Sequence, residues 1–145
     1  MPTHAEKRNL PHSSHQMFDL VSDVGKYPEF LPWCVGVRLK QRTEENISAD
    51  MMIGYKMFRE KFSCHVELNY PKRIDVVYED GPFKYLNNHW IFIEEDNGSC
   101  TIDFFVDFEF NSILLQKVIG VVFNEAVKIM VHAFEKRANV VYKRL

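Results

Sequence analysis

No run of apolar residues in this sequence is long enough to cross a membrane. The longest, from Val118 to Phe123, ends at Asn124, whereas a membrane-spanning helix needs roughly 20 apolar residues. The first residues also lack the apolar segment of a signal peptide. Neither sign of charge dominates, because 18 Lys and Arg oppose 20 Asp and Glu for a net charge of −2. Domains that bind nucleic acid are normally strongly basic, so we expect no DNA partner.

Cysteine is scarce and irregularly placed. The three cysteines, Cys34, Cys64 and Cys100, are odd in number, lie far apart and form no CxxC pair. A disulfide framework or a zinc site needs closer and paired spacing. We therefore expect reduced thiols, no bound metal and a cytoplasmic location.

Catalytic motifs are absent as well. None of the six histidines belongs to an HExxH motif, and the chain has no GxSxG, P-loop or GxGxxG sequence. A lone histidine is more often structural than catalytic. We nominate no catalytic residue and expect a protein that is not an enzyme.

The longest regular pattern lies at the C-terminal end, where residues 112–142 follow a helical period of 3.6. Polar residues form one narrow stripe: Lys117, Asn124, Lys128, Glu135 and Asn139. The opposite arc is apolar: Leu115, Ile119, Val122, Phe123, Ala126, Val127, Ile129, Met130, Ala133 and Phe134. An arc this wide indicates a helix gripped by a curved sheet, or a helix that forms one wall of an apolar pocket.

Most of the preceding chain alternates with a period of two, which is typical of strands with one buried face. The predicted inward residues include Val35, Val37, Leu39, Ile47, Ala49, Met51, Ile53, Phe62, Cys64, Val66, Ile74, Val76, Cys100, Ile102, Phe104 and Phe108. In residues 85–94, Trp90 and Phe92 compete with Ile91 and Ile93 for the buried face. Before the strands, Ser13 and Gln16 suggest a capping box that opens a short helix. We predict an α+β fold, with five or six antiparallel strands wrapped around the C-terminal helix as one domain over residues 1–145.

Glu60 is the most informative departure from this pattern, because it lies in phase with inward residues of its strand. A buried carboxylate is unfavourable unless it is protonated or paired. Arg137, inside the apolar arc of the helix, is the predicted partner. The pair could be purely structural, Glu60 could reach water at a rim, or it could orient a ligand.

Methionine and aromatic residues raise two further alternatives. Met17, Met51, Met52, Met57 and Met130 could fill an ordinary core or line a cavity for a flexible apolar ligand. The aromatic segment of residues 27–33 could plug one end of the core or form a tip that touches a membrane.

Several motifs, taken in order along the chain, resemble the coenzyme Q-binding START-type proteins, whose bacterial members are often labelled RatA-type or polyketide cyclase-like. They are Tyr27-Pro28-x-Phe30-Leu31-Pro32-Trp33-Cys34, Glu60-x-Phe62-Ser63-x-x-Val66, Gly81-Pro82-Phe83-Lys84-x-Leu86, Trp90-x-Phe92 and Phe108-x-Phe110. The resemblance implies a helix-grip (START/Bet v 1-like) fold around an apolar tunnel. It also implies binding of ubiquinone or a related isoprenoid lipid, as a carrier that supports respiratory electron transport, with no other cofactor.

From the resemblance and the pattern together, we expect ligand contacts on the sheet and on the C-terminal helix. The sheet and loop candidates are Trp33, Met51, Met57, Phe58, Glu60, Phe62, Val66, Lys84, Phe104 and Phe108. The helix candidates are Phe123, Ala126, Met130, Ala133 and Arg137. A carrier of this kind would contact the inner membrane peripherally, plausibly through residues 27–33.

Two other functions remain open. The first is the toxin role claimed for RatA-type relatives, which block the association of ribosomal subunits. Outward basic residues such as Arg38, Lys40 and Arg42 could contact RNA phosphates in that role.

The second alternative function is that of a polyketide cyclase or aromatase that uses Glu60 as a general acid and base. It needs a second titratable group, and Arg137 cannot exchange protons at neutral pH.

Overall fold

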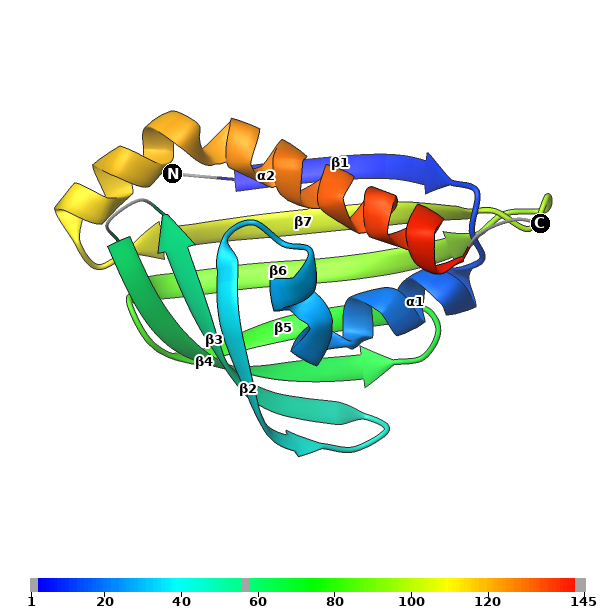
Figure 1. Cartoon of the computed structure of the whole chain (residues 1–145), viewed down its shortest axis with the longest axis horizontal. Coiled ribbons are helices and arrows are strands. Elements are labelled where there is room, and N and C mark those ends of the chain that lie inside the picture. The colour runs from blue at the N-terminus through cyan, green and yellow to red at the C-terminus, as the bar shows by residue number, and fades with distance from the viewer. Residues whose placement is uncertain (1–2, 56–57, 143–145) are drawn as a thin grey trace.

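The computed structural model describes residues 3–55 and 58–142 and forms a curved sheet with a long helix laid across it (Figure 1). Within these ranges seven strands make one sheet. The strands are β1 (Thr3–Leu10), β2 (Cys34–Arg42), β3 (Asn46–Tyr55), β4 (Phe58–Asn69), β5 (Arg73–Asp80), β6 (Phe83–Glu94) and β7 (Cys100–Phe110). The helices are α1 (Ser14–Ser22), the 3₁₀ helix η1 (Val24–Glu29) and α2 (Ile113–Val141).

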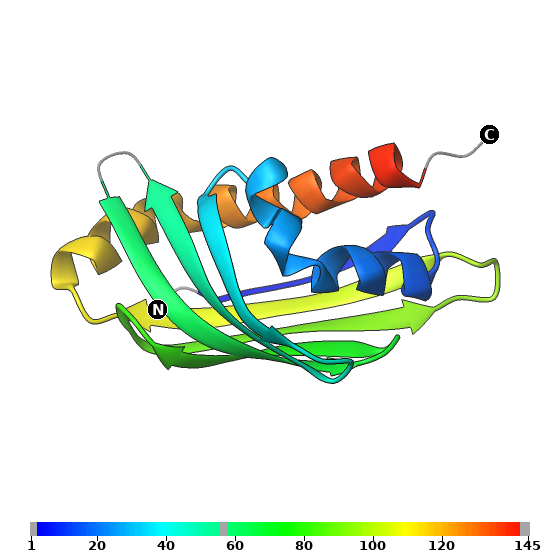
Figure 2. The same ribbon diagram turned by 60° about the horizontal axis from the view of Figure 1, so that its bottom comes forward.

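The sheet has the order β1-β7-β6-β5-β4-β3-β2, and every neighbouring pair is antiparallel. The α+β prediction is therefore confirmed, with more strands than the five or six expected, because the polar segment of residues 3–10 pairs with β7. In Figure 2 the strands β2, β3 and β4 curl upwards toward α2. The sheet thus surrounds its own apolar face instead of lying flat beneath the helix.

Helix α2 follows the prediction closely, since it begins after Ser112 and ends before Tyr142. The Ser112 hydroxyl accepts a hydrogen bond from the backbone N–H of Leu115 at 3.2 Å, which caps the first turn. The inner face carries Leu115, Phe123, Val127 and Phe134, all buried. The predicted inward position of Ile129 is wrong, because its side chain is 46% exposed.

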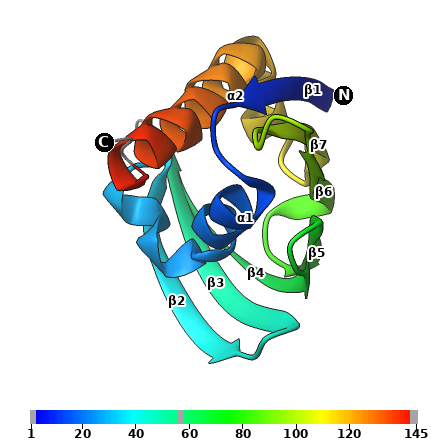
Figure 3. The same ribbon diagram turned by 90° about the vertical axis from the view of Figure 1, so that its right-hand side faces the viewer.

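Helix α1 closes one end of the curved sheet, where Figure 3 shows it inside the ring formed by the strands and α2. The predicted capping box is present: Gln16 N–H donates to the Ser13 hydroxyl at 3.1 Å, and Ser13 N–H donates to the Gln16 side chain at 3.0 Å. Met17 and Val21 on its inner face are buried almost completely. The Tyr142 hydroxyl donates to the Gln16 carbonyl at 2.9 Å and so joins α1 to the end of α2.

Strand faces agree with the period-two prediction along β3, β4 and β7, where Ile47, Cys64 and Phe104 are buried. In β6, Trp90 and Phe92 take the buried face, and Ile93 is exposed. In β2 the prediction holds for Val37, which packs against the core, and is wrong for Val35 and Leu39, which are exposed. Register shifts between Cys34 and Gly36 and between Leu39 and Gln41 interrupt the alternation of that strand.

A row of polar contacts joins β1 to α2, which explains why the first strand is so polar. Arg8 donates to the Glu135 carboxylate at 2.6 Å, and His12 contacts the Asn139 side chain at 2.9 Å. Arg8 also lies 3.1 Å from the Glu6 carboxylate. Part of the polar stripe of α2 therefore faces the sheet edge instead of bulk water.

Replacing Ser13 with Ala tests the role of the capping box that starts α1. The substitution removes the acceptor for Gln16 N–H and should lower the free energy of unfolding by about 1 kcal/mol. Urea denaturation followed by circular dichroism measures the change. Ser13→Asp, which keeps a side-chain acceptor, should retain most of the stability; an equal loss in both variants would contradict the cap as the cause.

Candidate functional site

The space between the sheet and α2 contains an apolar chamber of about 250 Å³, here called the first chamber. Its floor is formed by inward residues of β3, β4, β6 and β7, and its roof by the middle of α2. The lining residues are Trp33, Ile53, Gly54, Glu60, Phe62, Phe83, Leu86, Val106, Phe108, Phe110, Ile119, Phe123, Ala126, Val127 and Met130. Glu60 is the one charged residue in this lining.

A second chamber of about 200 Å³ adjoins the first on the side of α1 and η1. It is lined by Val24, Tyr27, Leu31, Cys34, Met51, Val66, Ile74, Val76, Asn88, Trp90, Phe104 and Phe134, together with six residues that line both chambers. The shared residues are Trp33, Ile53, Phe62, Leu86, Val106 and Met130. The two chambers are therefore adjacent parts of one hollow, near the low end of the roughly 300–1,000 Å³ typical of small-molecule pockets.

Aromatic rings hold the walls of the hollow in place by packing against one another. Phe83 stacks on Phe110 with ring centroids 4.7 Å apart, and Phe108 meets Phe123 of α2 edge-on at 5.1 Å. Trp90 contacts Phe134 of α2 at 4.9 Å. Between these contacts, the small residue Ala126 stands where a larger side chain would reach into the first chamber. Helix α2 is thus packed against the sheet by aromatic side chains at some turns, whereas at Ala126 its side chain is too small to fill the space below.

Few polar groups reach the hollow. The Asn88 side chain donates to the Phe105 carbonyl at 2.8 Å, and the Trp33 indole N–H donates to the Ala126 carbonyl at 3.4 Å. The Tyr27 hydroxyl donates to the Val21 carbonyl, and burial raises the pKa of Tyr27 far above its ordinary value. Glu60 is half-buried, as expected for a carboxylate in an inward strand position near a rim.

Most of the predicted ligand-binding residues that the structure describes line the hollow. They are Trp33, Met51, Glu60, Phe62, Val66, Phe104, Phe108, Phe123, Ala126 and Met130. Ala133 packs against the core but lines neither chamber. Met57 lies outside the described residues, and so does the side chain of Phe58. Their binding roles remain predictions, as do those of the ten residues that line the hollow.

The predicted pairing of Glu60 with Arg137 is wrong. Arg137 donates to the Glu29 carboxylate of η1 at 2.9 Å, and its guanidinium lies 5.2 Å from the centre of the Phe30 ring. The hydrogen bond from Arg137 lowers the pKa of Glu29. Arg137 lies near the end of α2 that faces η1, whereas Glu60 lines the first chamber beneath the middle of the helix. Arg137 therefore tethers α2 to η1 and does not line the hollow.

Lys84 is also misplaced in the predicted ligand-binding set. Lys84 is in phase with the inward residues Leu86 and Asn88, but a register shift between Phe83 and Tyr85 breaks the alternation of β6 there. Phe83 takes the buried position instead, and Lys84 lies on the outer face. There its ammonium group lies 3.5 Å from the Glu109 carboxylate, and 58% of the side chain is exposed. Lys84 borders an outer groove on β5 and β6 and neither chamber.

Sequence reasoning missed several lining residues, chiefly Leu86 and Asn88 of β6 and Ile119 of α2. Leu86 and Asn88 alternate in phase with Trp90, so fixing the face of Trp90 would have found them.

The aromatic segment of residues 27–33 packs inwards: Tyr27 and Phe30 each meet Phe134 edge-on, with ring centroids 5.4 and 5.2 Å apart. The structure thus favours the plug over the exposed tip.

The three cysteines are buried and free, as predicted for reduced thiols. Burial raises the pKa of Cys64 to about 12 and that of Cys100 to about 11, and it also raises the pKa of Cys34. Since the thiolate is the reactive form, these side chains are chemically inert packing groups.

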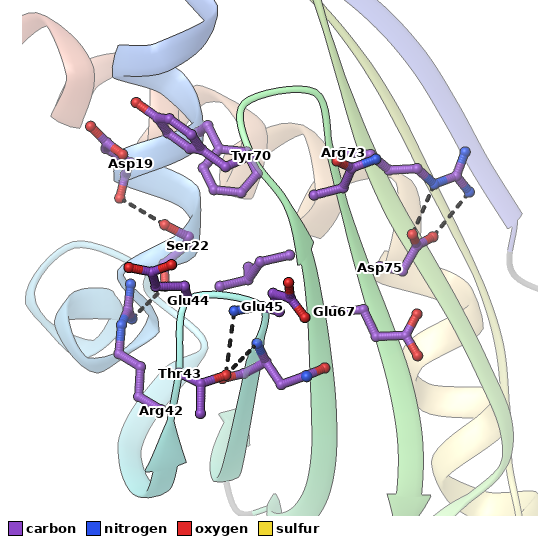
Figure 4. Close-up of a pocket in the computed structure, with 14 residues that line it drawn as sticks. Asp19, Ser22, Arg42, Thr43, Glu44, Glu45, Glu67, Tyr70, Arg73 and Asp75 are labelled. Atoms are coloured by element: carbon purple, nitrogen blue, oxygen red, sulfur yellow. Dashed lines mark hydrogen bonds and ion pairs between the residues drawn. The ribbon is translucent and has the colours of Figure 1, made fainter.

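A separate polar groove of about 1,220 Å³ lies between α1 and two hairpins (Figure 4). It shares no lining residue with either chamber. Arg42 donates to the Ser22 carbonyl at 3.0 Å, and Arg73 binds Asp75 through two hydrogen bonds of 2.8 and 2.9 Å. With both arginines already paired, this groove is a hydrated surface between α1 and two hairpins.

Among the described residues, no group of three or more His, Cys, Asp or Glu side chains could hold a metal ion. In the same ranges, no helix is both long enough and apolar enough to span a membrane.

A sequence family described as polyketide cyclase/dehydrase and lipid transport matches residues 10–135. The chain belongs to this family. A protein of Rickettsia prowazekii named ribosome association toxin RatA is 37% identical over 138 residues, which are 92% of this chain and 94% of the relative. A Xenopus laevis protein named coenzyme Q-binding protein COQ10 homolog B, mitochondrial, is 34% identical over 97% of this chain and 59% of its own length. The resemblance seen in the motifs is confirmed.

Solved structures confirm the helix-grip fold. The solution structure of an 18 kDa protein from Caulobacter crescentus is 33% identical, with a TM-score of 0.79 over 99% of this chain and all of the other. A Streptomyces aromatase/cyclase has a TM-score of 0.82 over 95% of this chain and 93% of its own, at 10% identity. At 10% identity, the similarity to the aromatase/cyclase establishes a shared fold and nothing about function.

Xenon tests whether the hollow is accessible to an apolar guest. Apolar cavities of this size remain dry and take up apolar atoms, so xenon pressure should shift the methyl resonance of Met130 in ¹³C NMR spectra. The exposed methyl groups of Val140 serve as the control. Equal, small shifts at both residues would show that the chambers are filled or closed.

Proposed function

We propose that this chain binds ubiquinone or a related isoprenoid lipid in the hollow, as a non-enzymatic carrier that supports respiratory electron transport. The observation that carries the proposal is the apolar lining of two adjacent chambers between the sheet and α2. The name of the Xenopus relative adds support for a quinone. In this role the protein would work in the cytoplasm and touch the inner membrane peripherally.

The physical basis is burial of an apolar chain. An isoprenoid tail gains roughly 25 cal/mol for each Å² of apolar surface that it removes from water. The flexible Met130, which borders both chambers, can adapt its side chain to an irregular tail. A few polar groups then fix orientation, as is usual in small-molecule sites.

Glu60 and Asn88 are the groups we assign to that orientation. Glu60 borders the first chamber, and Asn88 borders the second. They belong to different chambers, and the Asn88 amide is already engaged with the Phe105 carbonyl. A general acid–base mechanism needs a second titratable group beside Glu60, and none of the other described residues that line the first chamber is titratable. This arrangement supports binding without catalysis.

A second candidate is the activity in the name of the Rickettsia relative, a ribosome association toxin. The matched region covers nearly all of both chains, which favours it. The basic residues expected to contact the ribosome are partly neutralised, because Lys40 lies 2.9 Å and Lys61 lies 4.0 Å from the Asp50 carboxylate. Hydrogen bonds from Ser63 and Lys40 lower the pKa of Asp50.

Lipid extraction of the protein purified from its native host tests the first proposal. Native mass spectrometry and organic extraction should recover a prenyl quinone bound to the wild-type protein. Recovery of no prenyl lipid, and no uptake when ubiquinone is supplied, would overturn the proposal.

Met130→Trp tests whether the hollow is the binding site. The indole would fill the junction of the two chambers, so quinone retention should fall at least tenfold while the fold persists. Ile129→Trp is the matched control, since the neighbouring side chain on the same helix is exposed. Fluorescence quenching by added ubiquinone measures affinity, and equal affinity in both variants would place the ligand elsewhere.

Co-sedimentation with ribosomal subunits separates the second candidate from the first. If ribosome association is electrostatic, binding should weaken steeply as salt rises, and Arg38→Glu should reduce it. The Met130→Trp variant should bind subunits as the wild type does. A loss of subunit binding on filling the hollow would mean that the two activities share one site.

A further inference from the structure

The first half of α2 exposes large aliphatic side chains to solvent. Val121 is 86% exposed, Ile113 is 76% exposed and Leu114 is 63% exposed. Gly120 adds no side chain, and the space beside it is open. Together with Lys117 these residues form a surface here called the α2 outer face, residues 113–121. Exposed aliphatic residues gathered on one short segment mark an interaction site more often than scattered ones do.

This outer face lies directly across the helix from the first chamber. Ile119 and Phe123, on the inner side of the same turns, line that chamber. Figures 1 and 2 show the first turns of α2 at the end of the molecule opposite α1. The exposed face therefore lies over the chamber that α1 does not close.

The charge of this segment is uniform. Between Ser112 and Asn124, Lys117 is the one ionisable residue, and its side chain is exposed. The positive end of the helix dipole lies at the same end of α2. A lysine among exposed aliphatic groups can extend its ammonium group to anionic headgroups while its stem stays in an apolar layer.

The second half of α2 is held differently. Polar contacts from its residues reach β1, η1 and α1: Glu135 to Arg8, Arg137 to Glu29, Asn139 to His12 and Tyr142 to Gln16. In the first half, the described contacts to other elements include two hydrogen bonds and no ion pair: Phe110 N–H donates to the Gln116 side chain at 2.8 Å, and the Trp33 indole N–H donates to the Ala126 carbonyl at 3.4 Å. The end of α2 over the first chamber is thus the less restrained one.

We infer that the α2 outer face docks on a lipid bilayer that contains anionic phospholipids, on the side of the molecule where α2 covers the first chamber. This inference rests on the proposed lipid-binding function and replaces residues 27–33 as the membrane contact. Aliphatic residues of the face enter the boundary between headgroups and acyl chains, and Lys117 binds a headgroup phosphate. Docking there brings the less restrained end of α2, with the first chamber beneath it, to the bilayer from which an isoprenoid lipid would leave.

Vesicle flotation with the full chain tests the docking. Wild-type protein should float with phosphatidylcholine vesicles that contain phosphatidylglycerol, and less with pure phosphatidylcholine. Val121→Glu should lower the partition coefficient about tenfold, because one buried valine is lost and a charge is added. Lys117→Gln should lower it about fivefold on the anionic vesicles alone.

Val140→Glu is the matched control, because Val140 is 62% exposed on the other half of the same helix. It should partition as the wild type does. Equal losses in Val121→Glu and Val140→Glu, or no vesicle binding by the wild type, would overturn the docking face. Self-association that Val121→Glu abolishes, without vesicle binding, would assign the face to a second copy of the chain.

Quinone uptake, measured on the same variants without vesicles, separates the two proposals. Val121→Glu should still take up ubiquinone, since its side chain faces away from the chamber. Uptake without vesicle binding would remove the docking and leave the carrier function. Vesicle binding without any uptake would remove the carrier function and leave the docking.

Discussion

The distance between α2 and the sheet is the constraint on which this structure depends. Side-chain contacts from Arg8, Glu29 and His12 hold the second half of the helix to β1, η1 and the segment before α1. Ring contacts such as Phe108 with Phe123 set the height of the helix above the strands. With the helix fixed at that height, side chains as small as Ala126 cannot fill the space below it. The hollow is thus a consequence of how the helix is supported.

An unfilled apolar volume is unfavourable, because the residues around it lose packing contacts that a filled core would provide. A chain that keeps such a space gives up stability that a larger residue at a position such as Ala126 would restore. Occupation by an apolar ligand recovers part of this free energy. The same physical term therefore links the architecture of the sheet and helix to a lipid-binding role, and the family relationship agrees with it.

Sequence periodicity predicted most of the fold because a strand or helix with one buried face repeats its apolar residues at a fixed spacing. It correctly placed Glu60 in the lining, since the alternation of β4 is regular. It failed for Val35 and Leu39 because register shifts in β2 break the alternation without a local sequence signal. It failed for Arg137 because a helical period gives the face of a residue but not its neighbour, and η1 supplied Glu29. Lys84 entered the site through the family resemblance, and alternation with Leu86 and Trp90 would also have placed it inside; the register shift between Phe83 and Tyr85 turns it outwards without a local sequence signal.

Helix α1 occupies one end of the ring formed by the strands and α2 (Figure 3), and toward that end Val24 and Tyr27 of η1 line the second chamber. The leading end of a lipid that enters through the first chamber would therefore lie against η1 and Trp90 in the second chamber. The combined length of the two chambers also limits how much of a lipid tail can be buried, because any longer tail must protrude from the protein. Two lipids with one headgroup and tails of different length would then differ in how much of each remains outside the protein.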